Sequence, residues 1–468
     1  MSDKKYNGEK NKVNSRYLVF ISLIAGMGGY LFGYDWVVIG GAKPFYEVYF
    51  SIAHIPWLQG WVMSSALLGC ILGVIISGSL SDKYGRKFMM LLAAIIFAVS
   101  AFGTGAATTL NVFILFRIIS GIGIGIASNI SPMYLSEVSP PAVRGKFVAI
   151  YQLAVVLGIL SAQVANWLIA RPVIPGEEIL TSWNGQMGWR WMFWVPIFPA
   201  LLYLALSLVV PESPRWLVSR GNYAKATSVF SRIVNRVCAE ELIHEIKESI
   251  SNVVEAVPLS TLFKGRALKI TVIGVTIAVL QQWCGINVVF NYAQEIFSAA
   301  GYSVSDMLFN IVITGTVNVI FTFVGMYTVD RLGRRSLMLL GTIGLSLIYA
   351  VLGGGFYFQL EGIPMLVLVV LAIACYAMTL APVTWIVISE IFPTRLRAKG
   401  MAVSTFALWT ASFLLTYTFP LLNSGLGAYG TFWLYGVICV AGFLFIRRYL
   451  PETKGKPLEE IERLITGE

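Results

Sequence analysis

The chain has 468 residues, of which 57% are hydrophobic and only 12% are charged, and this composition excludes an ordinary water-soluble protein. The net charge of +10 would suit a nucleic-acid-binding protein, but so apolar a sequence favours lipid as its surroundings. Apolar runs of about 20 residues, each long enough to cross a bilayer core of about 30 Å, occur about twelve times. We therefore predict an all-α polytopic membrane protein with spans at residues 17–41, 57–80, 87–108, 111–133, 146–169, 189–210, 269–297, 307–329, 336–359, 364–389, 398–422 and 429–450.

The basic residues are distributed unevenly over the predicted loops. If both termini are cytoplasmic, nearly all of the 34 lysines and arginines fall on the cytoplasmic side, and the exceptions are Lys43, Arg171, Arg190 and the intramembrane Arg117. This is the positive-inside pattern, which predicts a multi-pass protein of the plasma membrane, in a bacterium the inner membrane. The lipid bilayer is the expected partner of these charges, and nucleic acid is not.

The first and fourth predicted spans each carry one charge at depth, Asp35 and Arg117. A lone charge in hydrocarbon is costly, so the two side chains are expected to pair. Moving the arginine away would favour protonation of Asp35, so the pair is either a proton switch or a permanent ion pair. The nearby Gly29-x3-Gly33 and Gly121-x3-Gly125 spacings predict close helix packing.

Three signatures at the cytoplasmic ends of the spans occur twice. Asp82-Lys83-Tyr84-Gly85-Arg86-Lys87 matches Asp330-Arg331-Leu332-Gly333-Arg334-Arg335, Glu137-x6-Arg144 matches Glu390-x6-Arg397, and Pro211-Glu212-Ser213-Pro214-Arg215 matches Pro451-Glu452-Thr453-Lys454 more weakly. We therefore predict a tandem duplication, with six-helix halves at 17–210 and 269–450 and cytoplasmic tails at 1–16 and 451–468.

The acids and bases in these signatures are candidate gating charges. Charge pairs that span the two halves on one side would act as a latch, whereas a solvated charged loop would contribute almost nothing. Asp82 and Asp330 could accept from nearby arginines and from helix N-termini. Glu137 with Arg144, and Glu390 with Arg397, could join the same networks. The candidates are Asp82, Arg86, Glu137, Arg144, Glu212, Arg215, Asp330, Arg334, Glu390 and Arg397.

Between the halves, residues 211–268 are polar and mixed in charge. Runs such as 224–226 and 240–246 have helical patterns, so short amphipathic cytoplasmic helices are predicted in preference to a flexible linker.

Residues 281–297 place amides inside an apolar run that begins Gln281-Gln282-Trp283-Cys284-Gly285-Ile286-Asn287. Amides in hydrocarbon need hydrogen-bond partners in neighbouring helices, in water or in a polar ligand. On an ideal helix Asn287 lies about 120° away from the face of Gln281, so a break near Gly285 would bring them together. The run is either a substrate site or a contact that holds helices together.

Together these motifs resemble a known family. The doubled Asp-basic-x-Gly-Arg-basic loops resemble the major facilitator superfamily, and the 211–217, Gln281-Gln282, Gly285-Ile286-Asn287 and 451–455 motifs resemble its sugar porter branch. That branch contains bacterial xylose/glucose-proton symporters and human facilitative glucose transporters. The resemblance covers about residues 17–456. It implies a twelve-helix bundle that works by alternating access, with one monosaccharide bound between the halves.

The resemblance also implies a set of sugar contacts. Amides complement hydroxyls, which donate and accept at once, and an aromatic face covers the C–H side of a sugar ring. The tryptophans of this set could instead pack in the core or against lipid, and Asn318 could bridge helices. The contacts are Gln152, Gln281, Gln282, Asn287, Tyr292, Asn318, Trp385 and Trp409.

Departures from the family pattern leave the sugar open. Leu408 stands where the compared transporters carry Asn or Gln, Ile159 where the xylose symporter has a second Gln, and Asn291 replaces the first Tyr of a pair. The family's proton symporters carry Asp at position 35 and its uniporters carry Asn. We therefore expect Asp35 and Arg117 to couple the import of a hexose or pentose, such as glucose or xylose, to a proton. A passive uniporter and a non-transporting sugar sensor are the alternatives.

The sequence contains no nucleophile elbow, phosphate loop or metal-ligand spacing, so we expect neither an enzyme nor a bound cofactor or metal. The five cysteines imply no disulfide framework. The expected functional unit is a monomer.

Overall fold

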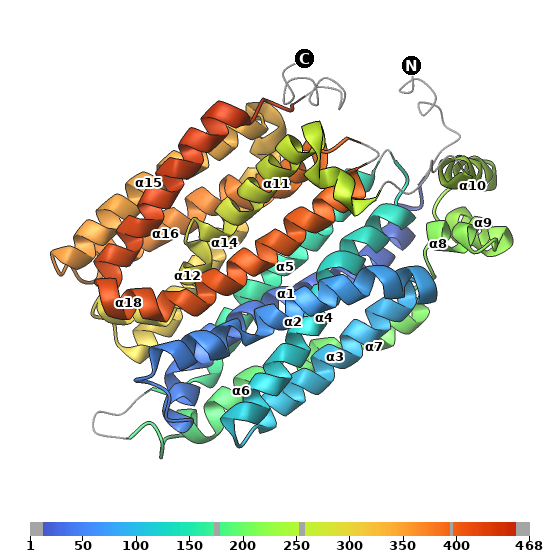
Figure 1. Ribbon diagram of the computed structural model, residues 1–468. Helices are drawn as coiled ribbons and strands as arrows, with labels where there is room; N and C mark the ends of the chain where they lie inside the picture. Colours follow the sequence, from blue (N-terminus) through green and yellow to red (C-terminus); the bar gives the residue numbers. More distant parts are fainter. Residues whose placement is uncertain (1–12, 142, 173–177, 252–257, 394–395, 455–468) are drawn as a thin grey trace.

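The computed structural model describes residues 13–141, 143–172, 178–251, 258–393 and 396–454, and the regular elements in these ranges are helices (Figure 1). The first half comprises α1 (Ser15–Tyr49), α2 (Pro56–Tyr84), α3 (Arg86–Ala106), α4 (Leu110–Val138), α5 (Arg144–Ile169), a π-helical turn at Asn184–Gly188, α6 (Trp189–Trp194) and α7 (Ile197–Val209). The intervening segment carries α8 (Pro214–Ser219), α9 (Tyr223–Ser231), α10 (Arg236–Ser251) and a 3-10 turn at Leu259–Phe263.

The second half comprises α11 (Gly265–Trp283), α12 (Ile286–Asn291), α13 (Ala293–Ala299), α14 (Val304–Leu332), α15 (Arg334–Tyr357), α16 (Ile363–Met378), α17 (Leu380–Ile391) and α18 (Arg397–Tyr449). Within the described ranges, 11 helical stretches are long and apolar enough to cross a membrane. The 53 residues of α18 contain a non-helical backbone at Gly427 (φ 69°, ψ 173°), which divides this stretch into two spans. With that division the twelve predicted spans are confirmed.

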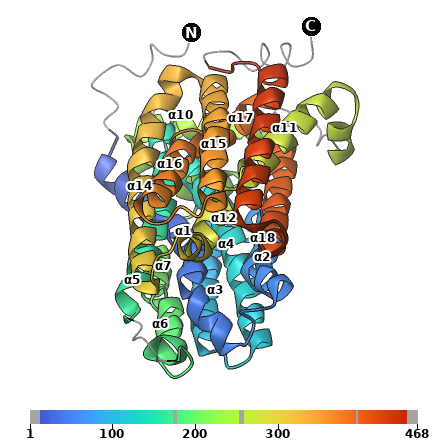
Figure 2. The same ribbon diagram turned by 90° about the vertical axis from the view of Figure 1, so that its left-hand side faces the viewer.

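The spans form two helical bundles that lie side by side (Figure 1, Figure 2). In the first bundle α1 packs against α4 and α5, and in the second α15 packs against α16 and α18. The start of α1, the end of α18 and α8–α10 lie at one end of the molecule, here called the terminal face. The opposite end is called the distal face. The two bundles contact each other through α1 with α12, α2 with α18, and α5 with α14.

Close backbone approach explains why these apolar helices associate. A Cβ atom on Gly33 would lie 1.9 Å from the Val155 carbonyl oxygen of α5, and one on Gly121 would lie 1.9 Å from the Ala66 oxygen of α2. The predicted close packing at these glycine spacings is therefore confirmed. In lipid, where apolar surface gives helices no hydrophobic reason to associate, such contact supplies the van der Waals attraction.

The polar segment between the halves folds as predicted into short helices. The Ser213 side chain accepts the Trp216 N–H at the start of α8, where Pro214 occupies the first helical position, and Asn222 caps α9 in the same way. Local capping therefore fixes these helices at the terminal face.

Candidate functional site

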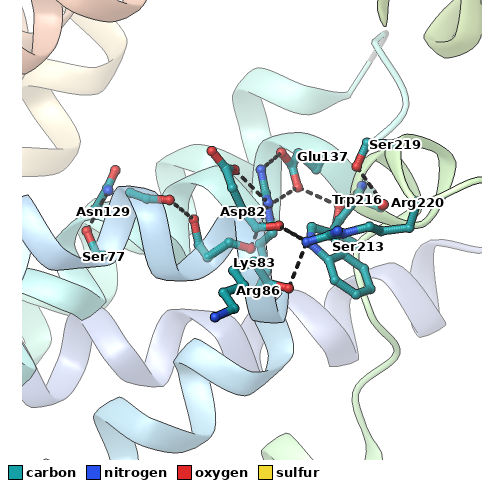
Figure 3. A network of polar contacts seen from close by, with 12 residues as sticks. Ser77, Asp82, Lys83, Arg86, Asn129, Glu137, Ser213, Trp216, Ser219 and Arg220 are labelled. Carbon is teal, nitrogen blue, oxygen red and sulfur yellow. Dashed lines mark hydrogen bonds and ion pairs between the residues drawn. The ribbon is translucent and has the colours of Figure 1, made fainter.

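At the terminal face, a network of charged side chains joins the end of α2, the start of α3 and the end of α4 (Figure 3). The Arg86 guanidinium donates to both oxygens of Glu137, at 3.0 Å each, and to Asp82 Oδ1 at 3.3 Å. Ser213 Oγ also donates to Glu137. A bidentate arginine–carboxylate pair of this kind is charge-assisted and fixes geometry as well as energy.

The carboxylate of Glu212 caps the start of α3. It accepts the backbone N–H of Arg86 at 2.9 Å and that of Lys87 at 3.2 Å, so it satisfies two donors that have no partner within the helix. Burial raises the pKa of the Glu212 carboxyl, and these N–H donors oppose that rise.

The second half repeats this arrangement. Glu452 accepts the backbone N–H of Arg334 at 2.9 Å and of Arg335 at 3.1 Å at the start of α15. The Arg334 guanidinium donates to Glu390 at 3.3 Å, and Thr453 Oγ1 donates to the same carboxylate at 2.6 Å. The predicted duplication is therefore visible in three dimensions, because the carboxylate cap, the arginine–glutamate pair and the hydroxyl donor each occur in both halves.

The charges of each half gather around one arginine, Arg86 in the first half and Arg334 in the second. Glu137 pairs with Arg86 and not with Arg144, which is exposed, and Glu390 pairs with Arg334. Glu137 reaches Arg86 because α4 ends beside the start of α3, whereas Arg144 begins the next helix, α5. Each of these pairs also stays within one half, so in this conformation they do not span the halves.

For three further gating candidates the described structure gives no ion pair. Arg215 is exposed, and Arg397 Nε and Nη2 are buried without a hydrogen-bond partner in the described structure. The side chain of Asp330 lies outside the described residues.

Gly85 gives the network a testable dependence on backbone conformation. Its φ is 95°, and a Cβ atom there would lie 2.1 Å from Glu212 Oε2. We expect Gly85→Ala to destabilise the fold by about 1–3 kcal/mol through backbone strain, with a further loss from the displaced cap. Thermal unfolding in detergent measures this. Gly78→Ala is the control, because a Cβ atom there meets nothing within 4 Å. Equal melting temperatures for the two variants would contradict the argument.

The amide-rich run at 281–297 is a broken helix. Gly285 adopts a left-handed conformation (φ 84°) between α11 and α12, and a second break at Tyr292 precedes α13. The predicted break near Gly285 is thus present. A glycine adopts this conformation without a steric penalty, and a Cβ atom there would lie 2.7 Å from the Tyr435 ring.

The break lets the amide side chains of Gln281, Gln282 and Asn287 form one hydrogen-bonded row. Asn287 Nδ2 donates to Gln282 Oε1, Gln282 Nε2 donates to Gln281 Oε1, and Gln281 Nε2 donates to the Tyr376 hydroxyl at 2.6 Å. These amides are buried, with at most 8% of each residue exposed. They form a row of donors and acceptors that a polyhydroxylated ligand could join.

The remaining predicted sugar contacts lie on four helices and at the junction of α12 and α13. Asn318 of α14 and Trp409 of α18 are buried, and the indole N–H of Trp409 has no hydrogen-bond partner. Gln152 of α5 is half-buried, and Trp385 of α17 is 38% exposed. Tyr292 is fully buried, and its hydroxyl donates to the Thr416 carbonyl of α18 at 2.7 Å, so its ring is fixed in position against α18.

Asp35 and Arg117 form the ion pair that their depth predicts. Arg117 Nη1 lies 3.1 Å from each carboxylate oxygen, and Ser120 Oγ donates to Asp35 Oδ2. Asp35 is 8% exposed and Arg117 is 2% exposed. A small cavity beside the pair is lined by Trp36, Ile39, Met63, Ala66, Leu67, Arg117, Ile124 and Asn291. It connects the charge pair with the second half.

The sequence-based prediction missed a second group of charges near the distal face. Lys43 and Glu47 lie in the last turns of α1, beyond the predicted span, and both are buried. Lys43 pairs with Glu295 of α13 in the other half. The i, i+4 spacing of Lys43 and Glu47 is the signal that could have extended the span, because an internally paired lysine is tolerated in an apolar helix.

Comparison with known proteins agrees over nearly the whole chain. A family model described as sugar (and other) transporter matches residues 21–465. The arabinose-proton symporter of Bacillus subtilis (strain 168) is 37% identical over 449 residues, which is 96% of this chain and 95% of that protein. The D-xylose-proton symporter of Escherichia coli (strain K12) is 37% identical over 481 residues, 96% of each. A solved structure of the xylose transporter XylE from E. coli in an inward-open conformation has a TM-score of 0.84 and 35% identity, covering 96% of this chain and 100% of that one.

Proposed function

The chain belongs to the sugar transporter family within the major facilitator superfamily, and from this premise we propose that it imports a monosaccharide together with a proton by alternating access. The observation that carries the proposal is that the two halves carry different kinds of polar group. A buried carboxylate–arginine pair lies in the first half, and a row of buried amides on a broken helix lies in the second.

We propose that the terminal face is cytoplasmic, as the distribution of basic residues predicts. The distal face is then the outer one. The halves touch near the distal face, where a Cβ atom on Gly40 would lie 3.0 Å from the Asn291 oxygen, and the Trp61 and Phe413 rings are 6.3 Å apart. The conformation is therefore assigned as closed outward, in line with the inward-open relative.

The charge pair supplies the proton step. While Arg117 and Ser120 hold Asp35, its carboxylate is stabilised without a proton. When the helices move and Arg117 withdraws, the carboxylate is left in a low-dielectric site and protonation removes its charge. Arg117 lines one small cavity together with Asn291 of α12, the helix that also carries Asn287, so movement of the pair would be felt next to the amide row.

The sugar site is assigned to Gln152, Gln281, Gln282, Asn287, Tyr292, Asn318, Trp385 and Trp409. The amide row offers hydrogen bonds to ring hydroxyls, and the unpaired Trp409 N–H is a further donor. The named relatives transport arabinose and xylose with a proton, which supports a pentose or a similar hexose as the substrate. A panel of monosaccharides competing against one labelled sugar identifies it.

Sugar added to proteoliposomes should alkalinise the outer medium, because each imported sugar carries a proton inward. In Gln282→Ala this signal should be lost at low sugar concentration and sugar affinity should fall about five- to 150-fold, since loss of a buried hydrogen-bonding group costs about 1–3 kcal/mol. Sugar binding is measured by calorimetry. The control is Gln186→Ala, an exposed amide near the distal face. Normal affinity in Gln282→Ala refutes the site, and sugar uptake without alkalinisation identifies a passive uniporter.

A further inference from the structure

The distal end of α1 carries a buried lysine that the transport steps above leave without a role. Lys43 is 2% exposed, and its ammonium group pairs with Glu295 of α13, across the boundary between the halves. It also lies 3.0 Å from Glu47 Oε1, one turn further along the same helix. Glu47 Oε2 accepts a hydrogen bond from Gln59 Nε2 of α2 at 3.1 Å.

A lysine at this depth is tolerated only while it is paired. The group has two carboxylates for one ammonium, so negative charge is in excess when the halves are together. Glu295 Oε2 is buried and has no hydrogen-bond partner in the described structure, so Lys43 compensates only one oxygen of this carboxylate.

The two carboxylates differ in what happens to them when the distal face opens. Lys43 and Glu47 belong to the continuous helix α1, and Gln59 belongs to the same half, so their contacts are kept in both states. The contact between Lys43 and Glu295 joins α1 to α13 and must break. Glu47 and Glu295 repel each other only while the gate is closed, because only then do they share one ammonium.

The same lysine lies against the sugar-binding helix. Its Nζ atom is 5.3 Å from the centre of the Tyr292 ring, and the Tyr292 hydroxyl donates to the Thr416 carbonyl of α18. One turn earlier in α1, Gly40 lies against the backbone of Asn291. Lys43 therefore holds the α12–α13 segment in place over the distal side of the site.

We propose, on the premise of the transport function above, that Lys43, Glu47 and Glu295 form a lock on the distal gate, in which the two carboxylates act in opposite directions. Attraction between Lys43 and Glu295 closes the gate. Repulsion between Glu47 and Glu295 limits the strength of the closed state, so that the gate reopens in each cycle. Lys43 is thus a positioning residue, which acts through the segment that carries Tyr292.

The test measures access to the cavity from outside. Ile39 lies one turn before Lys43, is 1% exposed and lines the cavity, so a cysteine there is reached from the distal side only when the gate opens. Whole cells expressing Ile39→Cys are treated with a membrane-impermeant maleimide. Labelling rates are compared with Glu295→Gln, Glu47→Gln or Lys43→Met added, and corrected with the same variants that keep Ile39.

Glu295→Gln should speed labelling about tenfold, which corresponds to ~1.4 kcal/mol in the gate equilibrium. Glu47→Gln should slow labelling, although it also neutralises a carboxylate beside the same ammonium. A role confined to folding would move both variants in the same direction. Lys43→Met should also speed labelling, and adding Glu295→Gln to it should slow labelling again, because without the ammonium the only interaction left to remove is the repulsion between Glu47 and Glu295.

The lock is refuted if Glu295→Gln labels at the parent rate or if the two glutamine variants shift together. Glu295→Gln is close in shape to the native residue, so it tests the lock even where Lys43→Met does not fold. Labelling requires no sugar. If labelling speeds up in Glu295→Gln and slows in Glu47→Gln but the protein moves no sugar, only the transport function is contradicted. If the protein imports sugar but labelling is unchanged in these variants, only the lock is contradicted.

Discussion

In proteoliposomes with an imposed membrane potential, Asp35→Asn should lose uphill sugar uptake and keep the exchange of labelled sugar across the membrane. With one proton per sugar, 100 mV supplies about 2.3 kcal/mol, which is on the order of 50-fold accumulation. Asparagine cannot take up or release that proton, so the variant should only equilibrate its sugar. The shape of the site is kept, because an amide still accepts from Arg117 and Ser120.

Asp306→Asn is the matched control for this loss. Asp306 is exposed at the start of α14, where its side chain accepts a hydrogen bond from Ser303, and the substitution should leave accumulation unchanged. Uphill uptake that survives in Asp35→Asn would remove the coupling role of the carboxylate. Loss of exchange together with accumulation would indicate instead that the pair holds the fold.

Gly60→Trp should abolish transport while sugar still binds from the distal side. Gly60 of α2 faces α18 across the two halves, and a Cβ atom there would lie 2.2 Å from the Tyr417 carbonyl oxygen. An indole cannot fit between two backbones at this distance, so the halves cannot close at the distal face. The protein would stay open outward, and both net uptake and exchange would stop because each requires closure.

The control places the same side chain on the same helix away from the boundary. Ile75 of α2 is 59% exposed, so Ile75→Trp adds bulk where there is room and should transport normally. Sugar binding is measured in detergent for both variants, and counterflow is measured in proteoliposomes. Exchange at the parent rate in Gly60→Trp would show that the distal contact seen here is not closed during transport.

The fold could be predicted because each of its causes is local. Apolar run length set the spans, the positions of lysine and arginine set the expected orientation, and repeated motifs revealed the two halves. The pairing of Asp35 with Arg117 followed from the cost of isolated charge at depth, with no knowledge of which helices touch.

The details that depend on neighbouring helices could not be read from spacing. Glu137 reaches Arg86 because α4 ends beside α3, which sequence separation does not reveal. The predicted first span ended before Lys43. Its partner Glu47 could have been read from the i, i+4 spacing, but its partner Glu295 on α13 could not. The assignments of Gln152, Asn318 and Trp385 rest on family resemblance, since the described structure shows no side-chain hydrogen bond for them.

The caps at α3 and α15 have a consequence for how the protein is made. Each of these helices starts on a carboxylate that follows the last span of its own half, Glu212 after α7 and Glu452 after α18. During synthesis the start of α3 therefore stays uncapped until three further spans, α4, α5 and α6–α7, have left the ribosome. In each half this cap forms only when the residues after the last span, Glu212 or Glu452, have been made and can reach the start of the third helix. Because the caps come from within each half, the first half can complete this contact before the second half is made.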